Sequence, residues 1–148
     1  MLRERGVDAW AKWPNDVYIG DRKVAGILTE MPALGRIIVG LGVNVRHQKA
    51  ELPLDTSTSL AAEGFDIDAT DIADRWVAIL LDRISRIDVA QDWIESTLGL
   101  IGDEVSIEFP DGAVRTGIVH GITSAGALRL DSGDPIVAGE ITRLRPAR

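Results

Sequence analysis

The sequence of 148 residues contains no cysteine. This absence excludes a disulfide framework, a cysteine-based zinc site and a thiol nucleophile. Positive charge is also scarce, because 16 Lys and Arg residues stand against 23 Asp and Glu residues and give a formal net charge of −7. A nucleic-acid-binding protein normally presents a basic face, so we do not expect this chain to bind DNA or RNA.

Long apolar runs are missing as well. No stretch reaches the roughly 18 apolar residues of a membrane-spanning helix, and the opening residues MLRERGVDAW contain no apolar core of a signal peptide. We therefore expect a cytoplasmic protein that makes no contact with a membrane. The composition, with 45% hydrophobic and 26% charged residues, is that of a folded globular protein.

The first part of the chain is rich in strand patterns. Residues 1–9 read as the end of a helix that stops at Gly6. Strands are expected over residues 17–19, 24–31 and 37–45, and their short connections predict antiparallel neighbours. The third strand is apolar on both faces, which predicts a central strand covered on both sides. So little chain before the first strand leads us to expect a further segment upstream in the complete protein.

A polar loop and helices follow the strands. The loop, residues 46–58, is longer than most connections, and such loops are often functional or mobile. The clearest helix covers residues 72–84, where apolar residues repeat at i+4, and Asp68 or Thr70 can cap its start. Shorter helical pieces are expected at residues 60–63 and 89–98.

The pattern changes near residue 99. Val105, Ile107 and Phe109 alternate with polar residues, and Pro-Asp-Gly at 110–112 forms a turn. Five short strands separated by turns predict a small SH3-like β-barrel over residues 99–148. The sequence thus predicts an α+β protein with a domain boundary between residues 98 and 99.

Three short motifs lie in the strand region: Lys12-Trp-Pro-Asn-Asp16, Lys23-Val-Ala-Gly-Ile-Leu28 and Gly40-Leu-Gly-Val-Asn44. Taken singly, the first is compatible with an ordinary strand end, where Trp packs, Pro turns the chain and the amide and carboxylate bond locally. Together, in this order and at this spacing, they resemble the biotin protein ligase family, also called biotin–[acetyl-CoA-carboxylase] ligases. A Thr-Ser-Leu element at residues 58–60 extends the resemblance, which covers essentially the whole chain.

The resemblance implies a fold and a reaction. Residues 1–98 would be the carboxyl-terminal part of a class II synthetase-like catalytic domain, a mixed sheet with helices, followed by the SH3-like barrel. The family joins biotin to ATP with Mg²⁺, giving biotinyl-5′-AMP and pyrophosphate, and then transfers biotin to one lysine of a biotin carboxyl carrier protein. Both steps move negative charge onto phosphate and carboxyl oxygens, which a fixed cation stabilises. Lys12 is the catalytic cation that the resemblance implies, in contact with the biotin carboxylate and the adenylate linkage.

Three further polar residues have open assignments. Asn15 and Asp16 either hold Mg²⁺-bound phosphates or orient the turn. A lone carboxylate is weak evidence for a metal ion, so no metal ligand is assigned. Lys23 either approaches the nucleotide phosphates or only flanks the preceding turn.

Glycines and one amide complete the expected site. A glycine inside a strand marks the close approach of a ligand or a backbone, and in the family Gly26 lies beside the biotin ring. Gly40 and Gly42 do not form a dinucleotide-binding fingerprint, because Val45 stands where a third glycine is required. They are expected to leave room for the adenylate, and Asn44 is expected to hydrogen-bond the nucleotide.

One family feature has no counterpart in this sequence, the Gly-Arg-Gly-Arg-x-Gly-Arg-x-Trp loop that binds biotin and adenylate. We therefore expect the isolated chain to be inactive, either as a piece of a longer ligase or as a non-catalytic binding module. A lipoyl or octanoyl ligase is the alternative enzyme, since it shares the catalytic fold. Residues 46–58 are expected to form a lid near the adenine, and His47 and His120 to have structural or solvent roles. An exposed half-sheet predicts self-association, a homodimer being one possibility.

Overall fold

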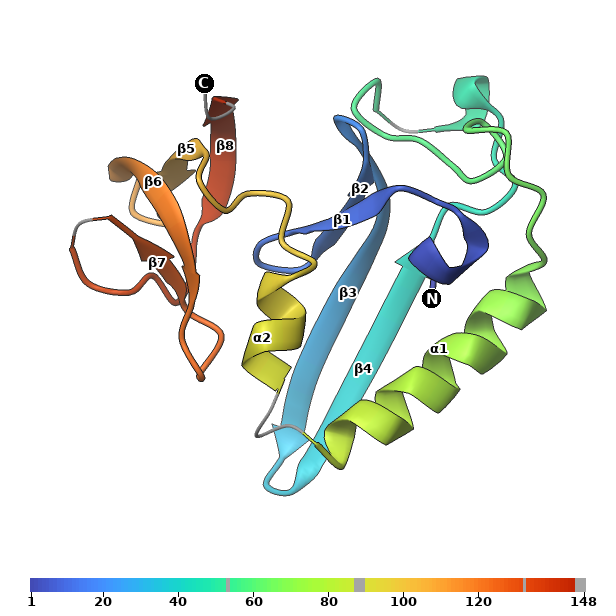
Figure 1. The fold of residues 1–148 in the computed structure, drawn as a ribbon, viewed down its shortest axis with the longest axis horizontal. Helices are drawn as coiled ribbons and strands as arrows, with labels where there is room; N and C mark the ends of the chain where they lie inside the picture. Colours follow the sequence, from blue (N-terminus) through green and yellow to red (C-terminus); the bar gives the residue numbers. More distant parts are fainter. Residues whose placement is uncertain (53, 87–89, 132, 146–148) are drawn as a thin grey trace. The chain divides into compact units, whose positions relative to one another are not determined.

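A computed structural model describes residues 1–52, 54–86, 90–131 and 133–145 (Figure 1). The chain separates into two units. The amino-terminal unit comprises Met1–Ala11 and Asn15–Ser85, and the carboxyl-terminal unit comprises Lys12–Pro14 and Arg86–Arg148. Each unit contains an antiparallel sheet and few helical residues, which agrees with the α+β class expected from the sequence.

The sheet of the amino-terminal unit has four strands in the order β1-β2-β3-β4. Their bounds are Ala9–Lys12, Asp16–Ile19, Arg22–Ala33 and Arg36–Val43. The β2–β3 and β3–β4 pairs are antiparallel, so the three expected strands and their pairing are confirmed. β1 was anticipated only as a strand end at Lys12 and was given no bounds, because its four residues are too short to show an alternating pattern.

The expectation that β4 is a central strand covered on both faces is wrong. β4 lies at the edge of the sheet, and Ile37 and Ile38 are 66% and 56% exposed. Apolar residues on both faces indicate burial only when other layers are present to cover them. The described residues provide no such layer over this end of the strand.

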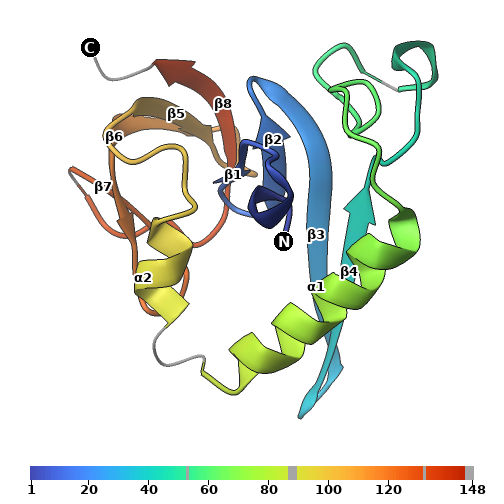
Figure 2. The ribbon, with the colours of Figure 1, turned by 45° about the vertical axis from the view of Figure 1, so that its right-hand side comes forward.

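The core of the amino-terminal unit lies under β1, the start of β3 and one end of the long helix. Its buried members are Leu2, Val7, Ala9, Val24, Ala25, Leu60, Ile67 and Ile72. The helix, α1, spans Ala69–Ile84 and runs beside β3 and β4 (Figures 1 and 2). Ile72 is buried and Trp76 is half-buried, whereas Val77 and Leu81 are exposed. The apolar stripe was therefore predicted correctly, but only its first turns are buried.

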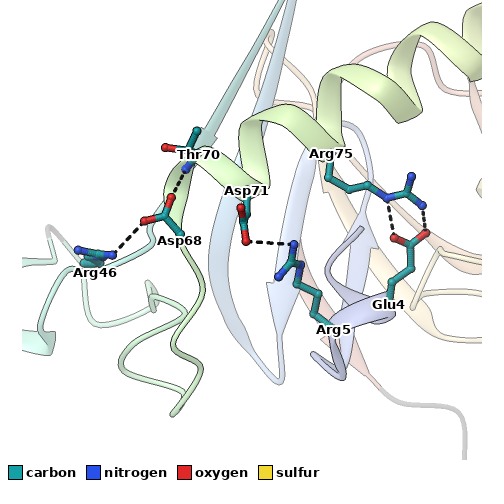
Figure 3. A network of polar contacts seen from close by, with 7 residues as sticks. All are labelled: Glu4, Arg5, Arg46, Asp68, Thr70, Asp71 and Arg75. Atoms are coloured by element: carbon teal, nitrogen blue, oxygen red, sulfur yellow. Dashed lines mark hydrogen bonds and ion pairs between the residues drawn. The ribbon is translucent and has the colours of Figure 1, made fainter.

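Polar contacts link α1 and its N-cap to the beginning of the chain and to Arg46 (Figure 3). Asp68, one of the two predicted caps, is the N-cap of α1. Its carboxylate accepts a hydrogen bond from the backbone N–H of Thr70 at 2.7 Å. This bond holds the pKa of Asp68 below its usual value. The remaining pairs are Glu4–Arg75 at 2.8 Å, Arg5–Asp71 at 3.5 Å and Arg46–Asp68 at 3.2 Å.

Two short helical predictions need correction. Within residues 1–9 only a 3₁₀ turn, η1 (Arg3–Arg5), forms, although Gly6 does end it with a φ of 78°. Residues 60–63 form a hydrogen-bonded turn rather than a helix. Four residues are too few to repay helix nucleation unless tertiary contacts supply it.

The carboxyl-terminal unit has a short helix and a second four-stranded sheet with the order β7-β6-β5-β8. The bounds are α2 Ala90–Glu95, β5 Glu104–Glu108, β6 Val114–Ile122, β7 Leu128–Leu130 and β8 Glu140–Arg145. The start of the second predicted helix, Val89, lies outside the described residues. Where a fifth strand was expected, the described residues show only an isolated bridge between Leu128 and Ile136.

Both helices of the described chain are too short or too polar to cross a bilayer.

Candidate functional site

A pocket of about 440 Å³ lies on the glycine-bearing surface of the amino-terminal sheet. Strand register produces this surface: Asp16 pairs with Gly26, which pairs with Gly42, and Leu28 pairs with Gly40. Residues directly opposite one another in an antiparallel pair project to the same face. The lining residues are Asn15, Asp16, Lys23, Gly26, Ile27, Leu28, Gly40, Leu41 and Gly42. Six of the eight sequence-predicted site residues are therefore gathered in one place.

An ion pair crosses this surface. Lys23 Nζ lies 2.5 Å from Asp16 Oδ1, with the two side chains 41% and 21% exposed. A Cβ added at Gly26 would lie 3.4 Å from Lys23 Cε and 3.5 Å from Asp16 Oδ1. Because Gly26 has no side chain, the ion pair can lie directly against the backbone of β3.

The two glycines of β4 leave more space. Among the described residues, the only atom within 4 Å of a Cβ built on Gly40 is the carbonyl oxygen of Leu28 at 3.8 Å, and for Gly42 it is the carbonyl oxygen of Gly26 at 4.0 Å. A side chain would therefore fit at either position without disturbing the protein. This bare strip of backbone is suited to a planar ligand that approaches the sheet closely.

The backbone of Lys23 is held from both sides by the end of the loop. Its N–H donates to the carbonyl of Thr56 at 2.9 Å, and its carbonyl accepts from the N–H of Thr58 at 2.8 Å. Ser57 forms a parallel bridge with Lys23. The position of the pocket's cation is consequently tied to residues 56–58.

Asn44 does not line the pocket. Its side-chain Nδ2 donates to the carbonyl of Thr58 at 2.9 Å, and its backbone bonds to Val24 and Leu60. The half-buried side chain of Asn44 therefore holds the end of the loop against β3 and β4. The amide oxygen is the part of Asn44 that is left for the predicted nucleotide contact.

A buried polar network at the same place was not identified from the sequence. Thr58 is fully buried and donates through Oγ1 to Glu63, while Glu63 Oε1 lies 2.7 Å from Arg22 Nη2. Ser59, also fully buried, donates to the carbonyl of His47 at 2.6 Å. The only available signal was the motif at residues 58–60, because spacing alone does not reveal which polar side chains are buried.

The first motif is divided between the two units. Asn15 is exposed and bonds through Nδ2 to the carbonyl of Ile27 at 3.0 Å. Lys12, the half-buried last residue of β1, does not line the pocket and groups with Trp13 and Pro14 in the carboxyl-terminal unit. Trp13 is only 6% exposed, and its peptide bond to Pro14 is cis.

Metal binding receives little support from the described residues, which contain no group of three His, Cys, Asp or Glu side chains able to hold an ion. Asp16, the one carboxylate in the pocket, is already paired with Lys23. These residues do not fit a Mg²⁺ site of their own. His47 and His120 are both exposed.

Two family models match separate stretches of the chain. Residues 2–44 match the biotin/lipoate A/B protein ligase family, and residues 100–143 match the biotin protein ligase C terminal domain. The first match includes all eight predicted site residues, and Asn44 is its last residue. The second match covers most of the carboxyl-terminal sheet.

Individual proteins are similar over most of the chain. The biotin–[acetyl-CoA-carboxylase] ligase of Mycobacterium tuberculosis is 34% identical over 90% of this chain, and the bifunctional ligase/repressor BirA of Escherichia coli is 29% identical over 96%. The chain spans 53% and 49% of these relatives. Among solved structures, the apo biotin protein ligase of Aquifex aeolicus matches with a TM-score of 0.79 at 25% identity, over 99% of this chain and 69% of that one. The same ligase in complex with biotin and ATP matches with a TM-score of 0.77, over 66% of its length.

Proposed function

The chain belongs to the biotin protein ligase family, and from this premise we propose that it supplies part of the machinery that attaches biotin to a lysine of a biotin carboxyl carrier protein. The observation that carries the proposal is the glycine-cleared pocket beside the Lys23–Asp16 ion pair. Its volume of about 440 Å³ falls within the usual range for small-molecule sites. A similar solved structure is described as holding biotin and ATP.

The proposed chemistry has two steps. The biotin carboxylate attacks the α-phosphorus of ATP, an oxygen–phosphorus bond forms, and pyrophosphate leaves. The carrier lysine amine then attacks the carbonyl carbon of biotinyl-5′-AMP, the amide forms, and AMP departs with the anhydride oxygen. Lys12 stabilises the negative charge that develops on the phosphate and carboxyl oxygens. Mg²⁺ accompanies the ATP phosphates in this proposal, and no step is assigned to it.

Lys23 is proposed as a second cation that exchanges partners. Its ammonium is paired with the carboxylate of Asp16 at 2.5 Å. A phosphate or carboxylate entering the pocket competes with Asp16 for this ammonium. Asp16 then acts as a placeholder that keeps a half-exposed lysine in position before the ligand arrives.

The other predicted residues receive contact roles. Gly26 is proposed to face the biotin ring, next to the Lys23–Asp16 ion pair that lies over it. Gly40 and Gly42 are proposed to face the adenylate, because the space above these two glycines is open to a ligand. Asn15 orients the turn before β2, and Asn44 offers its amide oxygen while fixing the end of the loop. Residues 46–58 are proposed as the lid.

Activity of the isolated chain is a separate question. The Gly/Arg-rich loop of the family is not present in these 148 residues. We propose that the chain binds the adenylate without forming it efficiently, because the arginines that would restrain its phosphate are not supplied. The remainder of a ligase, joined to this chain or added to it, would restore turnover.

The finer architectural expectations are part of the same proposal. They are a class II synthetase-like catalytic fold for residues 1–98, an SH3-like barrel for residues 99–148, homodimer formation and a cytoplasmic location. The four-stranded carboxyl-terminal sheet with its additional bridge at Ile136 supports the barrel. An experimental structure of the intact ligase would test the two folds and the dimer, and cell fractionation would test the location.

Calorimetry with a stable biotinyl-adenylate analogue tests the binding proposal. Lys12→Ala should weaken binding at least about tenfold, because a hydrogen bond between charged groups contributes about 1.5–3 kcal/mol. Arg36→Ala provides the control, since Arg36 is exposed at the start of β4 and lies outside both the pocket and the proposed lid. Absence of heat with biotin, ATP and the analogue would refute the binding proposal.

A steric variant tests the location. Gly40→Val should lower the affinity for the analogue at least tenfold without lowering the melting temperature, because only one backbone atom lies within 4 Å of the new Cβ. Thr29→Val, on the exposed part of β3, is the matched control. Equal affinities for the two variants would place the ligand elsewhere.

A lipoyl or octanoyl ligase is the competing enzyme, because the first matching family includes lipoate ligases. The match to a biotin protein ligase C terminal domain favours biotin. Labelling of a carrier protein by the completed enzyme with biotin but not with lipoate would decide between them.

A further inference from the structure

A buried indole ties the first motif to the carboxyl-terminal sheet. Trp13 is 6% exposed, and its Nε1–H donates to the carbonyl of Gly126 at 3.0 Å, across 113 residues of sequence. An indole nitrogen is only a donor, and a buried donor without an acceptor is costly. The bond therefore fixes where Trp13 can lie relative to the turn that contains Gly126.

The acceptor belongs to a well-braced turn between β6 and β7. The N–H of Gly126 donates to Thr123 O at 2.9 Å, and Thr123 N–H donates to Ala127 O at 2.8 Å. The N–H of Ala127 also donates to Thr123 Oγ1 at 3.2 Å. Gly126 has a φ of +80°, which a glycine adopts without strain.

The end of β6 just before this turn is braced as well. The carboxylate of Glu95 in α2 accepts from the backbone N–H of Ile122 at 2.9 Å. The residues after the turn, Ala127 and Leu128, are 5% and 0% exposed. The carbonyl of Gly126 is thus presented by a segment that is fastened on both sides.

We infer that the β6–β7 turn is a positioning element for Lys12, acting through Trp13. Lys12 immediately precedes Trp13, and both group with the carboxyl-terminal unit by their contacts. The tip of a connection between two strands is ordinarily mobile. A side chain used in chemistry has to be held within about 0.5 Å, which needs neighbours that lock its backbone. The Trp13–Gly126 bond supplies such a lock.

This inference gives the carboxyl-terminal unit a task in the ligase reaction, and in that respect it rests on the proposed function. The task is to hold the backbone of the Lys12–Pro14 segment in one arrangement. Trp13 and Gly126 are positioning residues, since neither is required to touch the reacting atoms.

The test uses the full chain and measures Lys12 directly. The chain has only three lysines, Lys12, Lys23 and Lys49, so mass spectrometry resolves the rate at which an amine-specific reagent modifies each. Trp13→Phe keeps an aromatic ring and removes the indole donor. The modification rate of Lys12 should rise about fivefold, because losing one hydrogen bond of about 1 kcal/mol makes local opening of this segment about five times more frequent. The modification rate of Lys49 should be unchanged.

Trp10→Phe is a closely matched control. Trp10 Nε1 also donates to a glycine carbonyl, that of Gly20 at 2.8 Å, but this bond stays within the amino-terminal unit. The control should leave the Lys12 rate unchanged even though it removes the same chemical group. Amide exchange at residues 123–127 should rise in Trp13→Phe and stay unchanged in Trp10→Phe.

A variant on the other side of the bond separates positioning from local damage. Gly126→Ala retains Trp13, and its Cβ meets no atom within 4 Å, but the positive φ strains the turn. It should raise the Lys12 rate as Trp13→Phe does. If both variants remain folded by circular dichroism and modify Lys12 at the wild-type rate, the positioning role is refuted.

These readouts need no ligand, so they are independent of the ligase proposal. If the wild-type chain binds no adenylate analogue but both variants loosen Lys12, the proposed function fails and the positioning role stands. In the completed ligase, Trp13→Phe should lower kcat/KM for adenylate formation, and the loss should be much smaller when Lys12 is already replaced by Ala. An equal loss in the Lys12→Ala background would show that the turn does not act through Lys12, and would also refute the role.

Discussion

The two units differ in how they place their large apolar side chains. In the carboxyl-terminal unit the facing strands bury theirs, and Val105 and Ile107 are 1% and 0% exposed. In the amino-terminal unit Met31, Ile37 and Leu81 are 65%, 66% and 65% exposed. Buried apolar surface contributes about 25 cal/mol per Å² to folding, and surface left exposed contributes nothing. The carboxyl-terminal unit also has exposed apolar side chains, Val137 at 83% among them, but the amino-terminal unit leaves such side chains exposed on β3, β4 and α1 alike. Exposed apolar surface on several elements is typical of an interaction surface.

The largest expected effect contrasts a closed core with an open face. Leu128→Ala, in the carboxyl-terminal core, should cost about 3 kcal/mol of unfolding free energy, the usual range for a fully buried leucine. Leu81→Ala, at an exposed position of α1, should change it by less than about 0.5 kcal/mol. Urea denaturation followed by circular dichroism measures both. Equal costs would mean that Leu81 is covered in solution.

Self-association provides the next contrast. The exposed residues of β4 and α1 should drive concentration-dependent association. Ile37→Lys should weaken this association about tenfold, because one large apolar side chain fewer is then buried at the contact. Val137→Lys is the control, because Val137 is 83% exposed but belongs to the carboxyl-terminal unit. Sedimentation velocity over a concentration series gives the comparison. A monomer at all concentrations would contradict the prediction.

A smaller effect is expected at the buried network beside the pocket. Glu63→Gln removes the charge that faces Arg22 at 2.7 Å and should destabilise the protein by about 1 kcal/mol, a value reduced because the Arg22 side chain is 36% exposed. Asp21→Asn removes a second carboxylate near the same guanidinium, 4.0 Å away and 98% exposed. This control should have no measurable effect on the melting temperature. If the two variants are alike, the burial of Glu63 contributes nothing.

The smallest effect concerns acid stability of the amino-terminal unit. The pKa of Glu4 is lowered by its hydrogen bond from Arg75, and that of Asp68 by the N–H of Thr70. Because the pKa values in the folded protein lie below the ordinary values of 4.5 and 3.8, this stabilisation is present above about pH 5. It is lost as the pH falls through the folded values. Asp68→Asn keeps an N-cap and should flatten the acid side of a stability–pH curve.

The candidate site residues were named from the resemblance of three motifs, and strand register explains why six of them meet at one pocket. Once Gly26, Gly40 and Gly42 are placed on antiparallel neighbours, alternation puts them on one face. The α1 cap at Asp68 was likewise readable from residue type and position.

What the sequence did not reveal depends on long-range contacts. The bond between Trp13 and Gly126 joins residues 113 positions apart, and no local pattern distinguishes it. The burial of Thr58 depends on β3 and β4 closing over the loop end. The exposure of β4 was misjudged for a related reason, since an apolar run shows that a strand can be covered and not that a covering layer is present.

The loop of residues 46–58 is closed at its base by its own bonds. Leu60 and Ala61 donate to the carbonyls of Asn44 and Val45, both at 2.9 Å, and Ser59 Oγ donates to His47 O at 2.6 Å. These bonds at the base offset the entropic cost of bringing the two ends of the loop together. Lengthening a closed loop adds only about 0.6 kcal/mol to that cost per doubling of its length. Insertions or a peptide tag between Gln48 and Asp55 should be tolerated without shifting Lys23, which makes the tip a convenient attachment point for a fluorescent reporter.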